Sequence, residues 1–501
     1  MQGFTVVDLV ILVIYLAAVL FAGLHFAKKE MKGKEYFKGD GTVPWWVTSV
    51  SIFATLLSPI SFLSLAGNSY AGTWIMWFAQ LGMLLAIPIT IKFFLPIYSK
   101  LDIDTAYHYL ELRFGSKGLR VLGAVMFIIY QIGRMSIIMY LPCMVLGSLT
   151  GISVNLLIII MGIIAIIYSY TGGLKSVLWT DFIQGSVLLI GVTFALIFLL
   201  AHLDGGFGAI AHALTTEHKF LAVDQPIFNA NIFKDSVFIL IVGAGFNTMG
   251  SYVSSQDIVQ RFTTTTDTKK LNKMMLTNGA LSIFIATVFY LIGTGLFVFY
   301  KQNALPPAAA QDQIFASYIA FELPVGVTGL LLAAIYAAAQ STLSTGLNSV
   351  ASSWALDIQS NLSKEELGFE KETKIGQRVS LAVGIFSIVV AMVLANGGVK
   401  SAYEWFNGFM GLVLGILIGT FILGAFTKVA NTFGATAAFI AASAVMVYIK
   451  YFVPAGQVTI WSYSIISIAV SLVVGIPASI IWRNIKGDKS EPAPNTTIYK
   501  N

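Results

Sequence analysis

Residues 329–345 read GLLLAAIYAAAQSTLST, an apolar run that ends in a cluster of amide and hydroxyl side chains. Ser341, Ser344 and Thr345 are spaced i, i+3 and i+4, so on a helix their hydroxyls share one face, which Asn348 extends by a turn. Serine and threonine in membrane helices commonly bond to the carbonyl four residues earlier or to a neighbouring helix. Three hydroxyls on one face instead favour a site for a small hard cation inside the bilayer.

Composition indicates an integral membrane protein. Of the 501 residues, 57% are hydrophobic and 11% are charged, whereas soluble proteins have about 25% charged residues. The net charge of +6 comes from Lys and Arg in short loops between apolar runs, so it is a topology signal and predicts no nucleic-acid partner. The partner that surrounds the chain is the lipid bilayer. Cys143 is the only cysteine, which excludes an intrachain disulfide.

Runs of about 20 apolar residues are interpreted as membrane spans. The sequence contains thirteen, at residues 5–26, 45–66, 74–98, 121–149, 152–170, 176–201, 233–253, 274–300, 315–357, 376–395, 402–426, 431–453 and 460–482. The run 315–357 is too long for one crossing. We expect its first part to be a connection on the outer side and its last turns to project into the cytoplasm.

Basic residues determine the expected orientation. They gather on one side, in the loops 28–38, 113–120, 261–273 and 364–378 and in the tail at 483–489, whereas the opposite loops hold few. Because cytoplasmic loops carry the excess of Lys and Arg, we expect a multi-pass protein of the cytoplasmic membrane with its N-terminus outside and its C-terminus in the cytoplasm. The polar tail after Arg483 is expected to be disordered.

Two spans are interrupted. The second contains Ser58-Pro59-Ile60-Ser61 and the seventh contains Gly243-Ala244-Gly245-Phe246-Asn247-Thr248-Met249-Gly250. Proline removes a backbone donor and clustered glycines weaken a helix, so both segments are expected to break and to free carbonyls at mid-membrane depth. Pro and Gly are also common in unbroken membrane helices. The spacing of five spans nevertheless predicts two inverted repeats, each opening with a broken helix.

This organisation predicts a single transmembrane domain over residues 1–501 without a soluble domain. Its expected parts are an extra first helix with a cytoplasmic loop at 1–44, a first repeat at 45–230, a second repeat at 231–427, and two additional helices with the cytoplasmic tail at 428–501.

Ionisable side chains also fall inside the spans. Arg134 lies well within the fourth, where an unpaired guanidinium costs at least about 2.5 kcal/mol. It binds a substrate carboxylate, forms a structural ion pair or snorkels to an interface. The substrate is favoured because no acidic residue lies at a matching depth in a neighbouring span. Asp181, near the cytoplasmic end of the sixth span, either provides charge for a second cation or stabilises a helix start. Asp257 is assigned mainly to structure, and Gln80 is a candidate partner of a polar substrate.

Several motifs connect the chain with a known family. They are Tyr36-Phe37 with the Gly-rich turn after it, Phe53-Ala54-Thr55, Tyr168-Ser169-Tyr170-Thr171-Gly172-Gly173, Trp179-Thr180-Asp181, Ser255-Gln256-Asp257-Ile258-Val259-Gln260-Arg261 and Ala337-Ala338-Ala339-Gln340-Ser341. With these motifs the chain resembles the sodium:solute symporters over nearly its whole length, and it looks most like their bacterial sialic acid branch. The resemblance implies an all-α integral membrane protein with a LeuT-like fold, built from two inverted five-helix repeats and three additional helices.

The resemblance also implies two sodium sites. The principal site would be formed by the backbone carbonyls of Ala54 and Leu57 and by Ser341, Ser344 and Thr345. A second site would combine Asp181 with Ser341, Ser344 and Thr345. One or two sodium ions would accordingly be co-transported.

For the substrate, the resemblance assigns Arg134 to the carboxylate of a sugar acid and places Ser58, Ser61 and Gln80 in the pocket lining. Asn247 in the seventh span is a further candidate contact. At Leu56 and Pro59 the branch pattern carries hydroxyls that this chain lacks.

The function expected from these features is sodium-coupled import of a carboxylated sugar, with sialic acid (N-acetylneuraminate) as the first choice, by alternating access in a monomer. A sodium symporter for another organic anion or for an amino acid such as proline is the alternative. A sodium channel or a sensor on the same scaffold also stays open. An enzyme is not expected, because the sequence has no His-Glu-x-x-His motif and no paired intramembrane aspartates.

Overall fold

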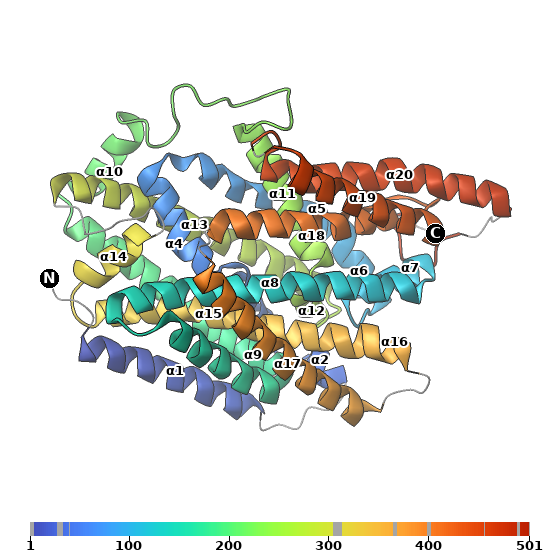
Figure 1. Ribbon diagram of the computed structural model, residues 1–501, viewed down its shortest axis with the longest axis horizontal. Helices are drawn as coiled ribbons and strands as arrows, with labels where there is room; N and C mark the ends of the chain where they lie inside the picture. Colours follow the sequence, from blue (N-terminus) through green and yellow to red (C-terminus); the bar gives the residue numbers. More distant parts are fainter. Residues whose placement is uncertain are drawn as a thin grey trace.

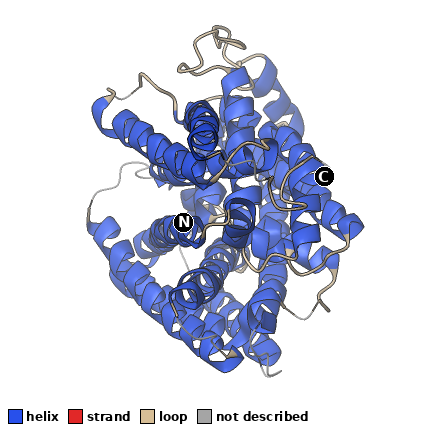
Figure 2. Ribbon diagram, turned by 90° about the vertical axis from the view of Figure 1, so that its right-hand side faces the viewer, coloured by secondary structure: helices blue, strands red, loops and turns tan. Residues whose placement is uncertain are grey.

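The computed structural model describes residues 5–27, 34–39, 41–303, 313–363, 368–397, 402–454, 456–487 and 491–499. Within these ranges every regular element is a helix (Figure 2). The first part of the chain forms α1 (Val6–Ala27), α2 (Lys34–Lys38), α3 (Trp45–Leu56), α4 (Pro59–Ala71), η1 (Trp74–Gly82), α5 (Met83–Ile89), η2 (Thr90–Phe94), α6 (Leu95–Leu101), α7 (Ala106–Phe114), α8 (Lys117–Thr150), α9 (Val154–Ala201) and α10 (Gly206–Thr215). The second part forms α11 (Val237–Ser254), α12 (Gln256–Phe262), α13 (Thr268–Gln302), α14 (Ile314–Phe321), α15 (Val327–Ser352), η4 (Ser353–Gln359), α16 (Ser360–Leu362), α17 (Phe369–Asn396), α18 (Ala402–Phe426), α19 (Thr432–Phe452), η5 (Ile460–Ser462) and α20 (Tyr463–Lys486).

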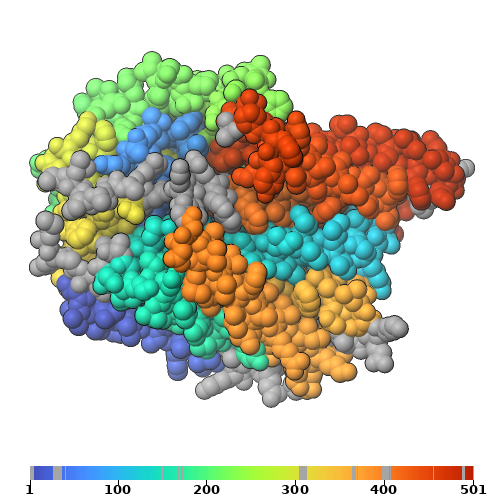
Figure 3. All heavy atoms as spheres, viewed as in Figure 1, coloured from blue at the N-terminus to red at the C-terminus, as the bar shows by residue number. Residues whose placement is uncertain are grey.

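The long helices run along one axis of the molecule, and the two chain ends lie at opposite ends of it (Figure 1). The end with the C-terminus also carries α7 and α16, and it is the predicted cytoplasmic end. α19 and α20 extend beyond the other helices at this end (Figure 3). On which side of the membrane each terminus lies stays a prediction.

The predicted spans correspond closely to helices. Among the described residues, eleven helices are long and apolar enough to cross a membrane, or twelve if the bent pair α3–α4 counts as one span. The spans predicted at 152–170 and 176–201 join in α9, which kinks at Gly173, where φ is 57°, a value that glycine adopts without strain. The run 315–357 divides into α14 and α15 as expected. The count of thirteen spans stays a prediction.

The second span is broken where the sequence predicts it. α3 ends at Leu56, Leu57 is extended, and α4 starts with Pro59 in its first turn. The two helices differ in direction by 63°. Ser58 caps α4 by accepting a hydrogen bond from Ser61 N at 3.4 Å, so the break is built from a proline and a serine cap.

The predicted break in the seventh span is wrong. α11 runs without interruption through 243–250 and ends only at Ser254. The glycines serve close packing: a Cβ on Gly243 would lie 2.1 Å from Trp461 O, and one on Gly82 would lie 2.4 Å from Gly245 N. The chain leaves the helical conformation at Ser255 instead, where α12 begins after one extended residue.

α15 lies at the centre of the bundle. In its most apolar window 89% of the residues are buried, the largest share among the candidate spans. Ser341, Ser344 and Thr345 are buried with the rest of this helix. Because the surrounding helices exclude bulk water, these hydroxyls must bond to protein groups or to a bound ion.

The expectation of a disordered tail is wrong for residues 491–499. Thr496 is fully buried, and its carbonyl accepts a hydrogen bond from Tyr109 Oη at 3.0 Å. Ile498 N donates to Ala425 O and Tyr499 Oη donates to Phe426 O, both at 3.0 Å. These acceptors belong to the last turn of α18, whose carbonyls have no partner within the helix.

Candidate functional site

The break between α3 and α4 places backbone carbonyls opposite the hydroxyl face of α15. Ser341 Oγ donates to Ala54 O at 3.0 Å, and Thr342 Oγ1 donates to Thr55 O at 3.3 Å. Thr55 O also accepts a hydrogen bond from Arg134 Nη2 at 2.6 Å. Carbonyls near the end of α3 lose their helical partners at the break, so side chains of other helices satisfy them.

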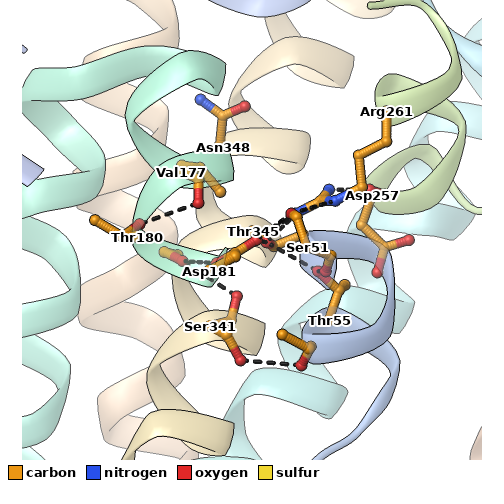
Figure 4. A network of polar contacts seen from close by, with 12 residues as sticks. Ser51, Thr55, Val177, Thr180, Asp181, Asp257, Arg261, Ser341, Thr345 and Asn348 are labelled. Carbon is orange, nitrogen blue, oxygen red and sulfur yellow. Dashed lines mark hydrogen bonds and ion pairs between the residues drawn. The ribbon is translucent and has the colours of Figure 1, made fainter. Parts of the chain in front are cut away.

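The structure therefore brings together part of the expected principal sodium site. Ser341 meets Ala54, and Thr345 Oγ1 lies 3.3 Å from Thr55 Oγ1 across the same joint (Figure 4). Ser344 turns toward α9, where its Oγ lies 3.4 Å from Asp181 Oδ1. Among the described residues, no hydrogen bond joins Leu57 to this face.

Asp181 is also part of the cluster. Its Oδ2 accepts hydrogen bonds from Ser51 Oγ at 2.7 Å and from Thr345 Oγ1 at 3.1 Å. Ser344 and Thr345 thus lie within reach of Asp181, as the expected second site requires, whereas no hydrogen bond among the described residues links Ser341 to it. The alternative of an interfacial carboxylate at a helix start is wrong, because Asp181 is fully buried within α9.

Arg261 is the residue of this cluster that the sequence did not reveal. Counted as part of a basic cytoplasmic loop, it is in fact fully buried. Its Nη2 lies 2.7 Å from Asp181 Oδ2 and donates to Thr345 Oγ1 at 2.6 Å, and its Nε donates to Ser51 Oγ at 2.9 Å. Figure 4 shows the guanidinium reaching from α12 into the hydroxyl cluster. Its place in the motif Ser255–Arg261 was the available signal.

Arg134 has the acidic partner that the sequence did not suggest. Its Nη1 pairs with Asp257 at the start of α12, and both side chains are almost fully buried. The prediction that no carboxylate lies at a matching depth is wrong, because α12 begins after the extended residue Ser255 and brings Asp257 into an ion pair with Arg134. The assignment of Asp257 to structure agrees with this pair.

Arg134 and Arg261 are linked through α12. Arg261 Nη1 donates to the backbone carbonyl of Asp257, and the side chain of Asp257 accepts from Ser255 Oγ at 2.5 Å. Two arginines and two aspartates therefore form one buried, electrically balanced network. Isolated buried charges are costly, and pairing of this kind reduces that cost.

A cavity of about 120 Å³ lies beside the broken helix. Three of the expected substrate residues line it, namely Ser61, Gln80 and Asn247. Ser58 and Arg134 are not among the lining residues. The sequence did not indicate the other members of the wall, which include Thr248, Phe406, Met410 and Trp461. The described lining residues carry no formal charge.

The family model of the sodium:solute symporters matches residues 36–442. The chain belongs to the sodium:solute symporter family. Similar members include the sodium/sialic acid symporter SiaT of Proteus mirabilis (strain HI4320), which is 33% identical over 99% of this chain and 100% of its own length. The sodium/sialic acid symporter NanT of Aliivibrio fischeri (strain ATCC 700601 / ES114) is 30% identical over 97% of this chain and 96% of its own length.

The backbone of this sodium:solute symporter matches that of a solved Na⁺-coupled sialic acid symporter in its substrate-bound outward-open state. The TM-score is 0.88 at 33% identity, over 96% of this chain and 98% of that chain. The expected all-helical, LeuT-like fold is confirmed, and more distant transporters share it at the level of fold alone. The protein is a multi-pass membrane transporter, not an enzyme, and sodium is its coupling ion.

Proposed function

We propose that this chain is a sodium/sialic acid symporter that imports N-acetylneuraminate together with one or two sodium ions. The observation that carries the proposal is the joint between the broken helix and α15, where the buried Ser341 Oγ lies 3.0 Å from Ala54 O. Two relatives that are at least 30% identical over nearly the whole chain are named sodium/sialic acid symporters. The geometry of this joint supports a bound sodium ion, and the names of the relatives support sialic acid as the substrate.

Sodium would bind where Ala54 O, Ser341 and the neighbouring hydroxyls meet. An ion at this point replaces a single hydrogen bond by several oxygen contacts and so holds α3 against α15. Loss of the ion to a cytoplasm low in sodium loosens the joint, which allows the transporter to release substrate. Each charge that moves inward gains about 2.3 kcal/mol per 100 mV of membrane potential, so two ions would concentrate the substrate far more than one.

A second sodium ion would bind at Asp181 with Ser344 and Thr345. The carboxylate already interacts with Arg261, 2.7 Å away. The ion and the guanidinium would therefore compete for the same oxygens. Sodium binding at Asp181 is accordingly expected to weaken the attachment of α12 to α9 and α15.

The substrate would enter the cavity beside α4. Gln80 makes no side-chain hydrogen bond to the described residues, and its amide lines the cavity. Ser61 and Asn247 provide further polar groups on the same wall. The cavity is smaller than the roughly 300–1,000 Å³ of typical ligand pockets, so binding of a sugar acid requires the cavity to widen. Its carboxylate would then reach Arg134, taking the place of Asp257.

The proposed topology follows the basic loops: N-terminus outside, C-terminus in the cytoplasm, in the cytoplasmic membrane. Transport by a monomer is part of the same proposal. The repeats at 45–230 and 231–427 remain part of the proposal.

One observation favours a second candidate substrate class. The described cavity wall is uncharged and Arg134 already has a carboxylate partner. A zwitterion such as proline would fit this wall without displacing Asp257. In that case Arg134→Ala would spare uptake after correction for the amount of folded protein, whereas uptake of sialic acid would be lost.

The test is uptake of radiolabelled sialic acid into proteoliposomes with an imposed sodium gradient and a clamped voltage. We expect sodium-dependent accumulation, and we expect Ser341→Ala and Ser344→Ala to raise the sodium concentration for half-maximal uptake. Uptake that does not depend on sodium would contradict the mechanism. Sodium flux without substrate would indicate a channel, and no flux of either would indicate a sensor or a different substrate.

A further inference from the structure

A fully buried glutamine lies on α9 one helical turn from Asp181. Gln184 has no exposed surface. Neither its amide oxygen nor its amide nitrogen has a hydrogen-bond partner among the described residues. Buried amides are nearly always hydrogen-bonded, so an amide without a protein partner at this depth needs an explanation, and the place of the residue in the bundle decides whether a bound ligand is the explanation.

The helix contacts place Gln184 on the side of α9 that faces α15. Asp181, three residues earlier, contacts Ser344 and Thr345. Seven residues after Gln184, a Cβ on Gly191 would lie 3.0 Å from Ala334 Cβ. Positions 181, 184 and 191 fall on one face of a helix with 3.6 residues per turn. Gln184 therefore lies between two residues that already touch α15.

The same contacts give its level along the bundle. This part of α9 runs antiparallel to α15: residue 181 contacts Ser344, and residue 191 packs against Ala334, ten residues earlier on α15. Gln184 is thus opposite residues 340–341 of α15, one turn from Asp181 toward the predicted outer side. This is the level at which Ser341 meets Ala54.

α3 approaches α9 at the same level. A Cβ on Gly185 would lie 3.2 Å from Ala54 Cβ and 3.6 Å from Val50 O. Gln184 is accordingly next to the residue of α9 that packs on Ala54, whose carbonyl is a proposed sodium ligand. The helix register therefore places Gln184 at the level of the Ala54–Ser341 joint, one helical turn from Asp181.

We propose that Gln184 is a sodium ligand that carries the ion between the principal site and Asp181. This inference rests on the proposed sodium symport. An amide oxygen is a hard, neutral donor of the kind that sodium accepts, and the absence of charge keeps the ion from being trapped in transit. The ion then moves from Gln184 to Asp181, one helical turn away on α9.

The experiment compares Gln184→Leu with Gln131→Leu in proteoliposomes. Gln131 on α8 is a matched control, because it is equally buried, its amide also has no partner among the described residues, and it lies beside Met135 and Gly346 on another helix. Both substitutions remove an unpaired buried amide. Only the substitution on α9 removes the proposed ligand.

We expect Gln184→Leu to raise the half-saturating sodium concentration by tenfold or more and to lower the Hill coefficient for sodium toward one. The KM for substrate at saturating sodium should change less than twofold. Gln184→Glu keeps an oxygen donor but adds a charge, so it should retain sodium binding while lowering the maximal rate of sodium-driven uptake. If the leucine variant fails to fold, Gln184→Asn, which withdraws the amide by one carbon, should show the same sodium defect. Sodium activation in Gln184→Leu that equals that of the wild type or of Gln131→Leu would overturn the inference.

A measurement without substrate separates this inference from the proposed function. Sodium chloride, but not potassium chloride, should raise the melting temperature of the detergent-purified protein, and Gln184→Leu should shift this effect to higher sodium concentration. If that shift is seen while no sialic acid uptake is found, the substrate assignment fails and the role of Gln184 stands. If the melting temperature of the wild type does not respond to sodium, or responds identically in Gln184→Leu, the role of Gln184 fails.

Discussion

Replacing Asp257 by leucine tests whether Arg134 serves the fold, the substrate or both. Asp257 is the only carboxylate that pairs with Arg134 among the described residues. Its loss leaves the buried guanidinium with one hydrogen bond, from Nη2 to Thr55 O at 2.6 Å. Removing one member of a buried ion pair costs about 3–5 kcal/mol.

This loss of stability can be expressed as a decrease in melting temperature. An unfolding entropy of about 2.1 cal/mol/K per residue gives roughly 1 kcal/mol/K for this chain of 501 residues. Asp257→Leu should therefore melt about 3–5 °C below the wild type. Arg134→Met should show a similar loss, because it leaves Asp257 buried without its cation.

The double variant Arg134→Met/Asp257→Leu should regain most of this stability, since apolar pairs often replace buried ion pairs at little cost. Arg113→Met is the control, because the three carbonyl acceptors of Arg113 on and after α18 do not involve Asp257. The loss of stability caused by Arg113→Met should simply add to the loss caused by Asp257→Leu. If the stability losses of Arg134→Met and Asp257→Leu also added up in the double variant, the interpretation of Arg134 and Asp257 as one structural unit would be refuted.

Transport by the stable double variant then decides the second role of Arg134. If the guanidinium binds the substrate carboxylate, the folded double variant should lose at least 10²-fold in sialic acid uptake at limiting substrate, about 2.7 kcal/mol. Sodium-dependent stabilisation should remain. Wild-type uptake by the double variant would refute the assignment of Arg134 to the substrate and favour the zwitterionic alternative.

Two further substitutions and one deletion test the packing of the protein. Gly243→Ala should destabilise the protein by about 1–3 kcal/mol and weaken substrate binding, because its Cβ would lie 2.1 Å from Trp461 O; unchanged melting and uptake would contradict this packing. Deleting residues 491–501 removes three hydrogen bonds to α7 and α18 and should lower stability by about 3 kcal/mol, with faster amide exchange in α7 as the readout; unaltered exchange would show that the tail does not hold α7. Lys219→Met should cost about 2–4 kcal/mol, because Nζ donates to Tyr70 O at 2.7 Å and to Gly72 O at 2.8 Å; a stability equal to that of the wild type would show that these carbonyls find water instead.

The sequence predicts the parts of the fold that depend on local chemistry. Apolar runs give the helices almost to their ends, and the proline with its serine cap gives the break at 57–58. The glycines of α11 cannot be interpreted in the same way, because a glycine weakens a helix when it is exposed and permits close contact when another backbone meets it. Gly243 meets Trp461, more than two hundred residues away, and no local pattern records that contact.

The candidate site shows the same limit. The hydroxyls of α15 could be predicted because their spacing on one helix is a local property. Arg261 could not, because its burial depends on Ser51 and Asp181, which lie on α3 and α9. A count of basic residues assigns it to a loop, although every residue of α12 is buried. Hydropathy thus finds Arg134 and Asp181 inside the spans but places Arg261, the ion-pair partner of Asp181, outside them.

α12 explains how sodium and substrate can act on one element. Asp257 and Arg261 are four residues apart, so they lie on the same face of this short helix, and the Arg261 side chain also donates to the Asp257 carbonyl. Under the proposed function, a substrate carboxylate at Arg134 would break the ion pair with Asp257, and a sodium ion at Asp181 would break the ion pair with Arg261. Either event alone leaves α12 held by the remaining ion pair. Hydrogen bonds of Gln256 and Gln260 to Ala106 N, Phe37 O and Asn348 also hold α12. The proposed function therefore predicts that ion and substrate together weaken the attachment of α12 more than either does alone, which would couple the two through one helix.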